Sequence, residues 1–170
     1  MSSLPEVWLR GPLAGFPPEL MPVAHSLLQV REELEAAVLP LSYDELWKKP
    51  GGAASVGFHV KHLACSLDRL LTYARGEALN DRQIAQLEGE AHSGSPDDQA
   101  HVVLRTAHAA IDRALDQLRA TPIEILHEPR RVGRGQLPST VLGLLFHAAE
   151  HAQRHAGQIV TTAKVVRNGG

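Results

Sequence analysis

Three histidines in the segment HAAEHAQRHAGQ are spaced by four residues: His147, His151 and His155. On an α-helix, side chains four residues apart are neighbours, with Cβ atoms about 5–6 Å apart. Two such imidazoles can converge on one metal ion, as they do in the helical H-x-x-x-H element of zinc proteases. The glutamate of the protease motif H-E-x-x-H is absent, because alanine follows the first histidine of either pair. The spacing therefore predicts a metal site without the protease base.

A second pair of histidines, His59 and His62, is three residues apart and also shares one face of a predicted helix. A catalytic metal site usually takes three protein ligands and leaves a position for water or substrate, and facing helices of a bundle can supply them. Spacing does not decide which pair of the last helix binds the ion, His147 and His151 or His151 and His155. It also does not decide whether His59 or His62 is the third ligand. The alternative is that these are ordinary helix histidines. We expect that role for the scattered remainder: His25, His92, His101, His108 and His127.

Four long helices must position these side chains. Helical spacing of apolar residues predicts them over about 19–39, 56–75, 96–120 and 138–164. Ser55 is placed to cap the second helix and Gly76 to follow it, and Ser95 and Pro96 are placed to start the third. Short helices are expected over 42–49, where Ser42 and Glu45 have capping-box spacing, and over 80–91.

The rest of the chain reads as irregular. Residues 1–18 are rich in proline and predict an arm that packs on the domain, residues 121–137 predict a long connection with at most a short extended segment, and 165–170 predict a frayed tail. No segment shows convincing strand alternation. We therefore expect an all-α protein, a four-helix bundle with additional short helices, forming a single domain over 1–170.

Composition restricts the partners. Apolar residues make up 44% of the chain and charged residues 21%, with a formal net charge of −2. No basic stripe indicates nucleic acid, and no apolar run or cationic leader indicates a membrane span or a signal peptide. The only cysteine, Cys65, has no internal disulfide partner, which favours a reducing cytoplasm.

Two segments resemble the DinB/YfiT-like family of bacterial metalloproteins. The first, SVGFHVKHLACSLDRLL, carries a Ser-aliphatic-Gly-x-x-x-x-His-Leu pattern on Ser55, Val56, Gly57, His62 and Leu63. The second, LPSTVLGLLFHAAEHAQRHAGQIV, carries the more specific His-x-x-x-His-x-Gly-Gln pattern on His151, His155, Gly157 and Gln158. The order and separation of the two segments match the family, as does the predicted four-helix organisation.

The resemblance implies a metal triad of His62, His151 and His155. It implies a divalent ion, commonly zinc or nickel, with open positions for water or substrate, and it implies frequent homodimers. Some relatives are thiol-dependent S-transferases or isomerases that use low-molecular-weight thiols such as bacillithiol or mycothiol. One departure is Ala156, where many members carry histidine or arginine before Gly-Gln. That position is not a ligand, so the triad is intact, but a substrate contact made there is in question.

Other residues near these motifs are candidates for supporting roles. We expect His59 and His147, each one turn before a ligand, to line the pocket as catalytic acid–base groups. Cys65 is a possible further ligand, although a buried core thiol is the commoner role. For the neighbours in the last helix we expect Glu150 at the surface, Gly157 at a close helix contact and Gln158 at a ligand or dimer partner. Three arginines of the connection could bind an anionic substrate group, although a solvated loop is the simpler reading: Arg130, Arg131 and Arg134.

Two functions fit these features. The first is a metal-dependent enzyme acting on a small molecule, by thiol transfer or by hydrolysis, because a three-histidine ion with open positions is a Lewis acid. The second is a non-catalytic metal- or small-ligand-binding protein with a role in stress. Neither a Ser-His-Asp pattern nor a glycine-rich phosphate loop is present in the sequence.

Overall fold

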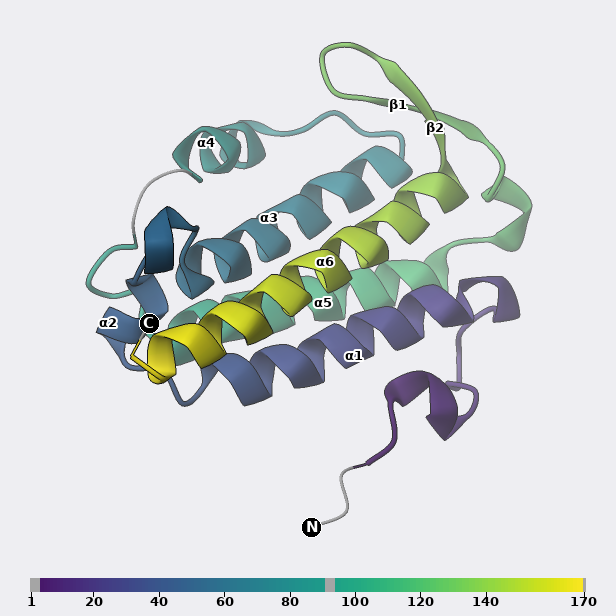
Figure 1. Ribbon diagram of the computed structural model, residues 1–170. Coiled ribbons are helices and arrows are strands. Elements are labelled where there is room, and N and C mark those ends of the chain that lie inside the picture. The colour runs from purple at the N-terminus through teal and green to yellow at the C-terminus, as the bar shows by residue number, and fades with distance from the viewer. Residues whose placement is uncertain (1–3, 91–93, 170) are drawn as a thin grey trace.

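The computed structural model gives the structure of residues 4–90 and 94–169, and it is a helical bundle (Figure 1). Its four long helices are α1 (Met21–Val38), α3 (Val56–Ala74), α5 (Ala100–Ala120) and α6 (Val141–Arg167). They pack in a ring in which α6 lies between α1 and α3, and α5 lies between α3 and α1 on the other side. The four-helix prediction is therefore confirmed. No helix within the described ranges is long and apolar enough to span a membrane.

The bundle forms because each long helix has one apolar stripe that must leave water. In α3 the stripe includes Val60, Leu63 and Leu67, which are at most 1% exposed, and in α6 it includes Leu145 and Ile159. These side chains meet in one core cluster shared by all four helices. Helices α3 and α6 each have a second face beside the apolar stripe, and these two faces carry the histidines.

The helix ends largely follow their predicted caps. Ser55 accepts a hydrogen bond from the backbone N–H of Phe58 at the start of α3, and Ser42 and Glu45 form the capping box of α2 (Tyr43–Trp47). The predicted start of α5 is wrong, because it begins at Ala100 instead of Pro96. The Asp98 carboxylate accepts bonds from the Ser95 backbone N–H and the Lys61 ammonium, which holds residues 95–98 in a turn.

The connection before α6 is more ordered than expected. Strands β1 (Pro129–Val132) and β2 (Leu137–Thr140) form an antiparallel hairpin, with Arg130 opposite Ser139. Strands of four residues at the edge of the molecule are too short to show the alternation that identifies a strand. Helix α6 consequently begins at Val141, capped by Thr140, and continues to Arg167, three residues beyond its predicted end.

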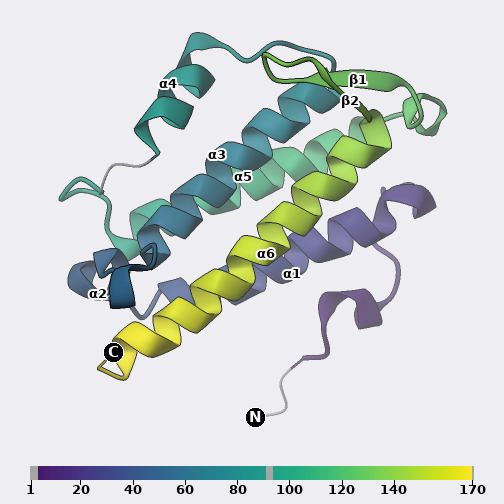
Figure 2. The same ribbon diagram turned by 45° about the horizontal axis from the view of Figure 1, so that its top comes forward.

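Helix α4 (Asp81–Gly89) lies outside the bundle, on the outer side of α3 (Figure 2). Helices α3 and α5 run in the same direction, so the chain must return along the bundle between them, and α4 forms part of that return. The only buried residue of α4 is Gln83, whose amide donates to Asp68 and Thr72 of α3 at 2.7 and 2.8 Å. Polar contacts therefore hold this helix in place.

Short 3₁₀ segments complete the chain: Val7–Arg10, Pro18–Leu20, Pro50–Gly52 and Ile123–Ile125. In the described part of the N-terminal arm, Val7 is buried and its backbone N–H donates to the Gln29 side chain of α1. Arg10 forms a two-pronged ion pair with Glu32, at 2.6 and 2.8 Å. The described part of the arm thus packs on α1.

Candidate metal centre

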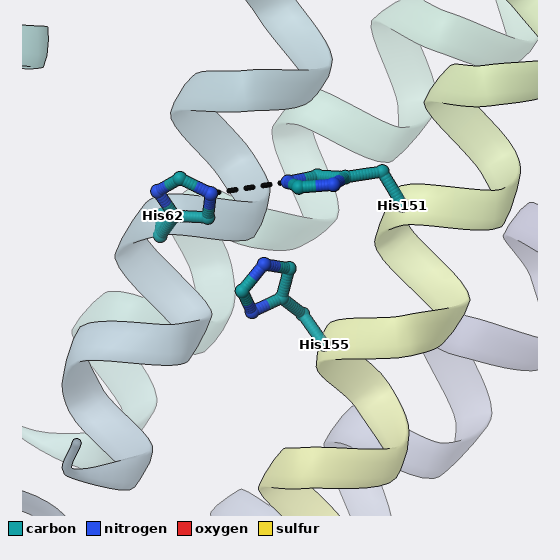
Figure 3. A group of neighbouring side chains, drawn as sticks. All are labelled: His62, His151 and His155. Carbon is teal, nitrogen blue, oxygen red and sulfur yellow. Dashed lines mark hydrogen bonds between the residues drawn. The ribbon is translucent and has the colours of Figure 1, made fainter. Parts of the chain in front are cut away.

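Three histidines from the antiparallel helices α3 and α6 meet between these two helices (Figure 3). His62 projects from α3, and His151 and His155 project from successive turns of α6. One ring nitrogen from each side chain lies within 4.8 Å of the others. Nε2 of His62 is 3.0 Å from Nε2 of His151. Helical spacing alone left several combinations of histidines open. Among the described residues, the group that comes together is His62, His151 and His155, which is the set that the family resemblance implies.

The arrangement fits a divalent ion. Two imidazole nitrogens bound to one tetrahedral zinc ion are about 3.3 Å apart, since each Zn–N distance is about 2.0–2.1 Å. The Nε2 atoms of His62 and His151 are already close to that separation, and a ring nitrogen of His155 lies within 4.8 Å of a ring nitrogen of each. Nδ1 of His151 is buried and makes no hydrogen bond to any residue in the described ranges. The donors are three imidazoles, which suit zinc and nickel.

Burial favours the neutral, metal-binding form of the two imidazoles on α6. Desolvation, followed by the proximity of His62 and His151, lowers the pKa of His155 to about 4. Desolvation also lowers the pKa of His151 below its ordinary value, with a further contribution from His62. A metal ion binds neutral imidazole, so the lowered pKa values of His151 and His155 reduce the competition of protons with a metal at these two residues.

Glu90, at the end of α4, holds the His62 ring in position. Its carboxylate accepts a hydrogen bond from Nδ1 of His62 at 2.7 Å and pairs with the Arg69 guanidinium at 2.5 Å. The Glu90 side chain is only 12% exposed. A hydrogen bond at one ring nitrogen fixes the tautomer, so Nε2 of His62 is left free for an ion. The sequence does not reveal this residue, because it belongs to a predicted surface helix 28 positions away.

His59 occupies the inner side of the site. Its Nδ1 lies 3.0 Å from Nδ1 of His155, and its side chain is buried. Desolvation and the nearby His62 lower the pKa of His59. This contact orients the His155 ring in the same way that Glu90 orients His62. The catalytic role predicted for His59 stays a prediction, and the structure places its ring against that of His155.

His147 lies at the outer edge of the site. Its side chain is 49% exposed and its Nδ1 is 3.2 Å from the Glu150 carboxylate. Its ring centroid is 5.5 Å from that of His151, one turn further along α6. Glu150 also binds Arg154, at 2.5 Å, which confirms its predicted surface position. Of the two predicted acid–base groups, His147 is the one that solvent reaches.

Other predicted site residues lie elsewhere. Cys65 faces α4 and α5 in a small groove and is not part of the metal-ligating group, and burial raises the pKa of its thiol. Gly157 is exposed and a Cβ there would meet no atom of the described chain, so the predicted close helix contact is wrong. Gln158 is also exposed. The three arginines, Arg130, Arg131 and Arg134, belong to the hairpin. His92 lies outside the described residues.

The motif glycine of α3 has a packing role instead. A Cβ at Gly57 would lie 2.7–2.8 Å from the indole of Trp47, which is closer than real side chains approach. The indole N–H donates to the Asp98 carbonyl at 3.1 Å. Gly57 is two residues before His59, and it lets α2 lie directly on the first turn of α3.

The fold and site define a helical-bundle protein with a three-histidine cluster that can hold a metal ion. Residues 26–159 match the model of the DinB superfamily, and the chain belongs to that superfamily. A solved structure described as a conserved protein from Enterococcus faecalis has the same fold, with a TM-score of 0.67 and 18% sequence identity. The match covers 88% of this chain and 97% of that one. No curated protein matches the chain.

Proposed function

We propose that the protein is a divalent-metal-dependent enzyme in which His62, His151 and His155 hold zinc or nickel. The observation that carries the proposal is the convergence of these three side chains at a partly open position. His155 is buried, whereas His62 and His151 are each only partly buried. A structural zinc site is normally closed by four protein ligands, and three ligands beside solvent leave room for a substrate.

An ion bound here would supply Lewis acidity, which favours the deprotonated form of a thiol or of water. The chain contributes orientation and a partly dry environment. Glu90 and His59 fix two of the ligand rings, and Phe58 stacks on His62 with ring centroids 5.7 Å apart. His147 is placed at the open edge, where it can accept a proton from the reacting group.

We propose a small electrophilic substrate and a low-molecular-weight thiol as the second reactant. In that reaction the thiol sulfur forms a bond to an electrophilic carbon, and the leaving group departs with the bonding electron pair. The thiol proton passes to His147 or to water. Hydrolysis is the variant in which water takes the place of the thiol. The family resemblance favours thiol transfer, and it also supports a homodimer, which light scattering on the purified protein would test. The single cysteine supports a reducing, cytoplasmic location.

Metal content measured together with turnover tests the proposal. We expect protein purified without added metal and without a histidine tag to carry about one ion per chain. His151→Ala should lower the affinity beyond the roughly 10–100-fold that loss of an outer hydrogen-bonding partner costs. His101→Ala, an exposed histidine of α5, is the control and should retain the ion. Undiminished metal in His151→Ala would exclude the triad.

The same variants separate an enzyme from a protein that only binds metal. We expect the metal-loaded protein to turn over an electrophile in a screen of bacterial thiols or an ester in a hydrolysis screen, and His151→Ala to lose that turnover. His147→Gln should lower turnover at unchanged metal content, because its imidazole is not a ligand. Stoichiometric metal without turnover in either screen would favour the binding protein.

A further inference from the structure

A second concave site lies between α4 and the hairpin, away from the histidines. It is a cleft of about 1030 Å³, bounded by the end of α3, the connection that follows it, α4 and the β1–β2 hairpin. None of the three ligand histidines lines it. Tyr73, its contribution from α3, is 11 residues beyond His62, which is about 16 Å along the helix. Figure 2 shows α4 and the hairpin on the same outer side of α3.

One wall of the cleft is apolar and has no partner in the described chain that buries it. Ile84 and Leu87, three residues apart on α4, share the helix face that borders the cleft, and Leu79 and Tyr73 extend this wall. Leu87 is 49% exposed. The bundle does not cover this face, since α4 is held by its polar Gln83. Apolar side chains gathered in a concave surface are typical of a ligand site.

The opposite wall carries positive charge. Arg131 and Arg134 project from the hairpin, and neither forms an ion pair with any residue of the described ranges. Arg130 is already committed, because it donates to the Ala74 carbonyl and binds Glu128. Of the acidic side chains at the cleft, Glu77 is neutralised by Arg75. No carboxylate of the described residues therefore neutralises Arg131 or Arg134, although Arg131 also donates to the Gln136 carbonyl at 3.3 Å. Both arginines line the cleft opposite the apolar wall, and Glu88 is the opposing charge on α4.

We propose that this cleft binds an amphipathic anion: a carboxylate whose head pairs with Arg131 and Arg134 and whose hydrocarbon body lies on Ile84 and Leu87. A guanidinium presents two parallel N–H donors that match a carboxylate. The volume accommodates a chain of about twelve carbons, because ligand pockets of about 300–1,000 Å³ hold drug-sized molecules. The site is separate from the metal centre and does not depend on the proposed reaction.

Dodecanoate is the probe for this site, measured by isothermal titration calorimetry below its micellar concentration. We expect one binding site per chain. Dodecyltrimethylammonium, which has the same chain length and the opposite charge, should bind at least about tenfold more weakly, because the free charges at the cleft are mainly positive. Equal binding of the two amphiphiles would overturn the assignment of the head group.

Two pairs of variants locate the site. Arg131→Gln combined with Arg134→Gln should weaken dodecanoate about tenfold or more, and Leu87→Gln should weaken it several-fold. The matched controls are Arg105→Gln combined with Arg113→Gln on α5, and Leu39→Gln after α1, where the leucine is 54% exposed. All of these side chains lie at the surface, and thermal unfolding checks that each variant is folded.

The proposal is wrong if dodecanoate does not bind the wild-type protein, or if the hairpin and control variants bind it equally well. Zinc binding by the hairpin variants serves as a separate readout. It should be unchanged, because Arg131 and Arg134 do not contact the histidines. A failure of dodecanoate binding thus leaves the metal proposal intact, and loss of metal in His151→Ala leaves the cleft proposal intact.

Discussion

At the scale of single residues, two glycines of the family motifs have opposite environments. Gly57 lies under the indole of Trp47, where a Cβ would come within 2.7 Å of the ring, whereas a Cβ at Gly157 would meet open space. We predict that Gly57→Ala destabilises the protein by about 1–3 kcal/mol, because the ring or the helix must move. Gly157→Ala should be neutral or stabilising by up to about 1 kcal/mol, because it removes a glycine from a helix interior.

Urea denaturation of both variants checks this prediction. The two substitutions add the same methyl group to a helix, so helix propensity alone gives them the same sign. If Gly57→Ala lowers the free energy of unfolding and Gly157→Ala raises it, the contact with Trp47 outweighs helix propensity at Gly57. Equal stabilisation of both proteins would contradict the close contact between Trp47 and α3.

Acidification should weaken the metal-free protein through His155. Its pKa in the folded state is lowered to about 4 by burial and by its histidine neighbours, whereas an unfolded chain titrates near 6.5. Between these values the unfolded state binds a proton that the folded state does not, so the free energy of unfolding falls as pH falls from about 6.5 to 4. One such proton accounts for a slope of at most about 1.4 kcal/mol per pH unit.

Urea denaturation of the protein, freed of metal with a chelator, at several pH values measures that slope. His155→Gln should reduce it, and the exposed His101→Gln should leave it unchanged. Some slope should remain in His155→Gln, because burial also lowers the pKa values of His59 and His151. An unchanged slope in His155→Gln would mean that its imidazole titrates alike in both states.

Glu90 should control metal affinity without being a ligand. Its carboxylate bonds Nδ1 of His62, which fixes the ring and makes its other nitrogen a better donor. We predict that Glu90→Gln weakens zinc binding about 10–100-fold, measured by competition with a chelator of known affinity. Glu88→Gln, on the same helix and without a contact to the histidines, is the control. Equal affinities for the two variants would rule out the positioning role of Glu90.

At the scale of elements, the sequence predicted helices correctly where a local pattern, apolar spacing or a capping residue, determines them. Apolar spacing predicted the four long helices, and local capping residues predicted the starts of α2 and α3. The start of α5 was missed because a contact distant in sequence helps to decide it, and the hairpin was missed because four-residue strands show too little alternation. Lys61 of α3 helps to hold the turn before α5 through Asp98, and pairing between β1 and β2 delays α6 until Val141.

The cap of α6 is an element-scale test, because this helix carries two of the three candidate ligands. The Thr140 hydroxyl accepts a bond from the Gly143 backbone N–H at 3.0 Å, at the junction between β2 and α6. We predict that Thr140→Ala lowers the free energy of unfolding by about 1 kcal/mol. Thr161→Ala, at an exposed position inside α6, should be neutral or slightly stabilising. Equal effects in urea melts would show that the cap contributes nothing to stability.

At the scale of the whole molecule, the sequence located the ligand-bearing helices but not what surrounds the ligands. Histidine spacing predicted pairs on two helices, and the family resemblance selected His62, His151 and His155 from them. His59 was predicted at the site in another role, but Glu90, which orients His62, escaped prediction because its contact depends on how separate elements dock. Glu90 reaches the site only because α4 returns along α3, and no local pattern encodes that placement.

Helix α4 therefore links the outside of the molecule to its metal centre. It is held on α3 by polar contacts, Gln83 to Asp68 and Thr72 at one end and Glu90 to His62 at the other. A helix that buries little apolar surface opens locally at low cost, so its hydrogen exchange should be fast. Metal binding at His62 should strengthen the Glu90 contact and slow the exchange of residues 81–89.

Hydrogen exchange measured by mass spectrometry, with and without zinc, tests this link. We expect zinc to protect residues 81–89 in the wild-type protein, and Glu90→Ala to lose most of that protection even at saturating zinc. Residues 100–120 of α5 are the internal reference, since this helix already packs in the core. Coupling of this kind is reciprocal, so conditions that release α4 should also weaken metal binding. Protection of 81–89 that persists in Glu90→Ala would show that zinc stabilises α4 by another route.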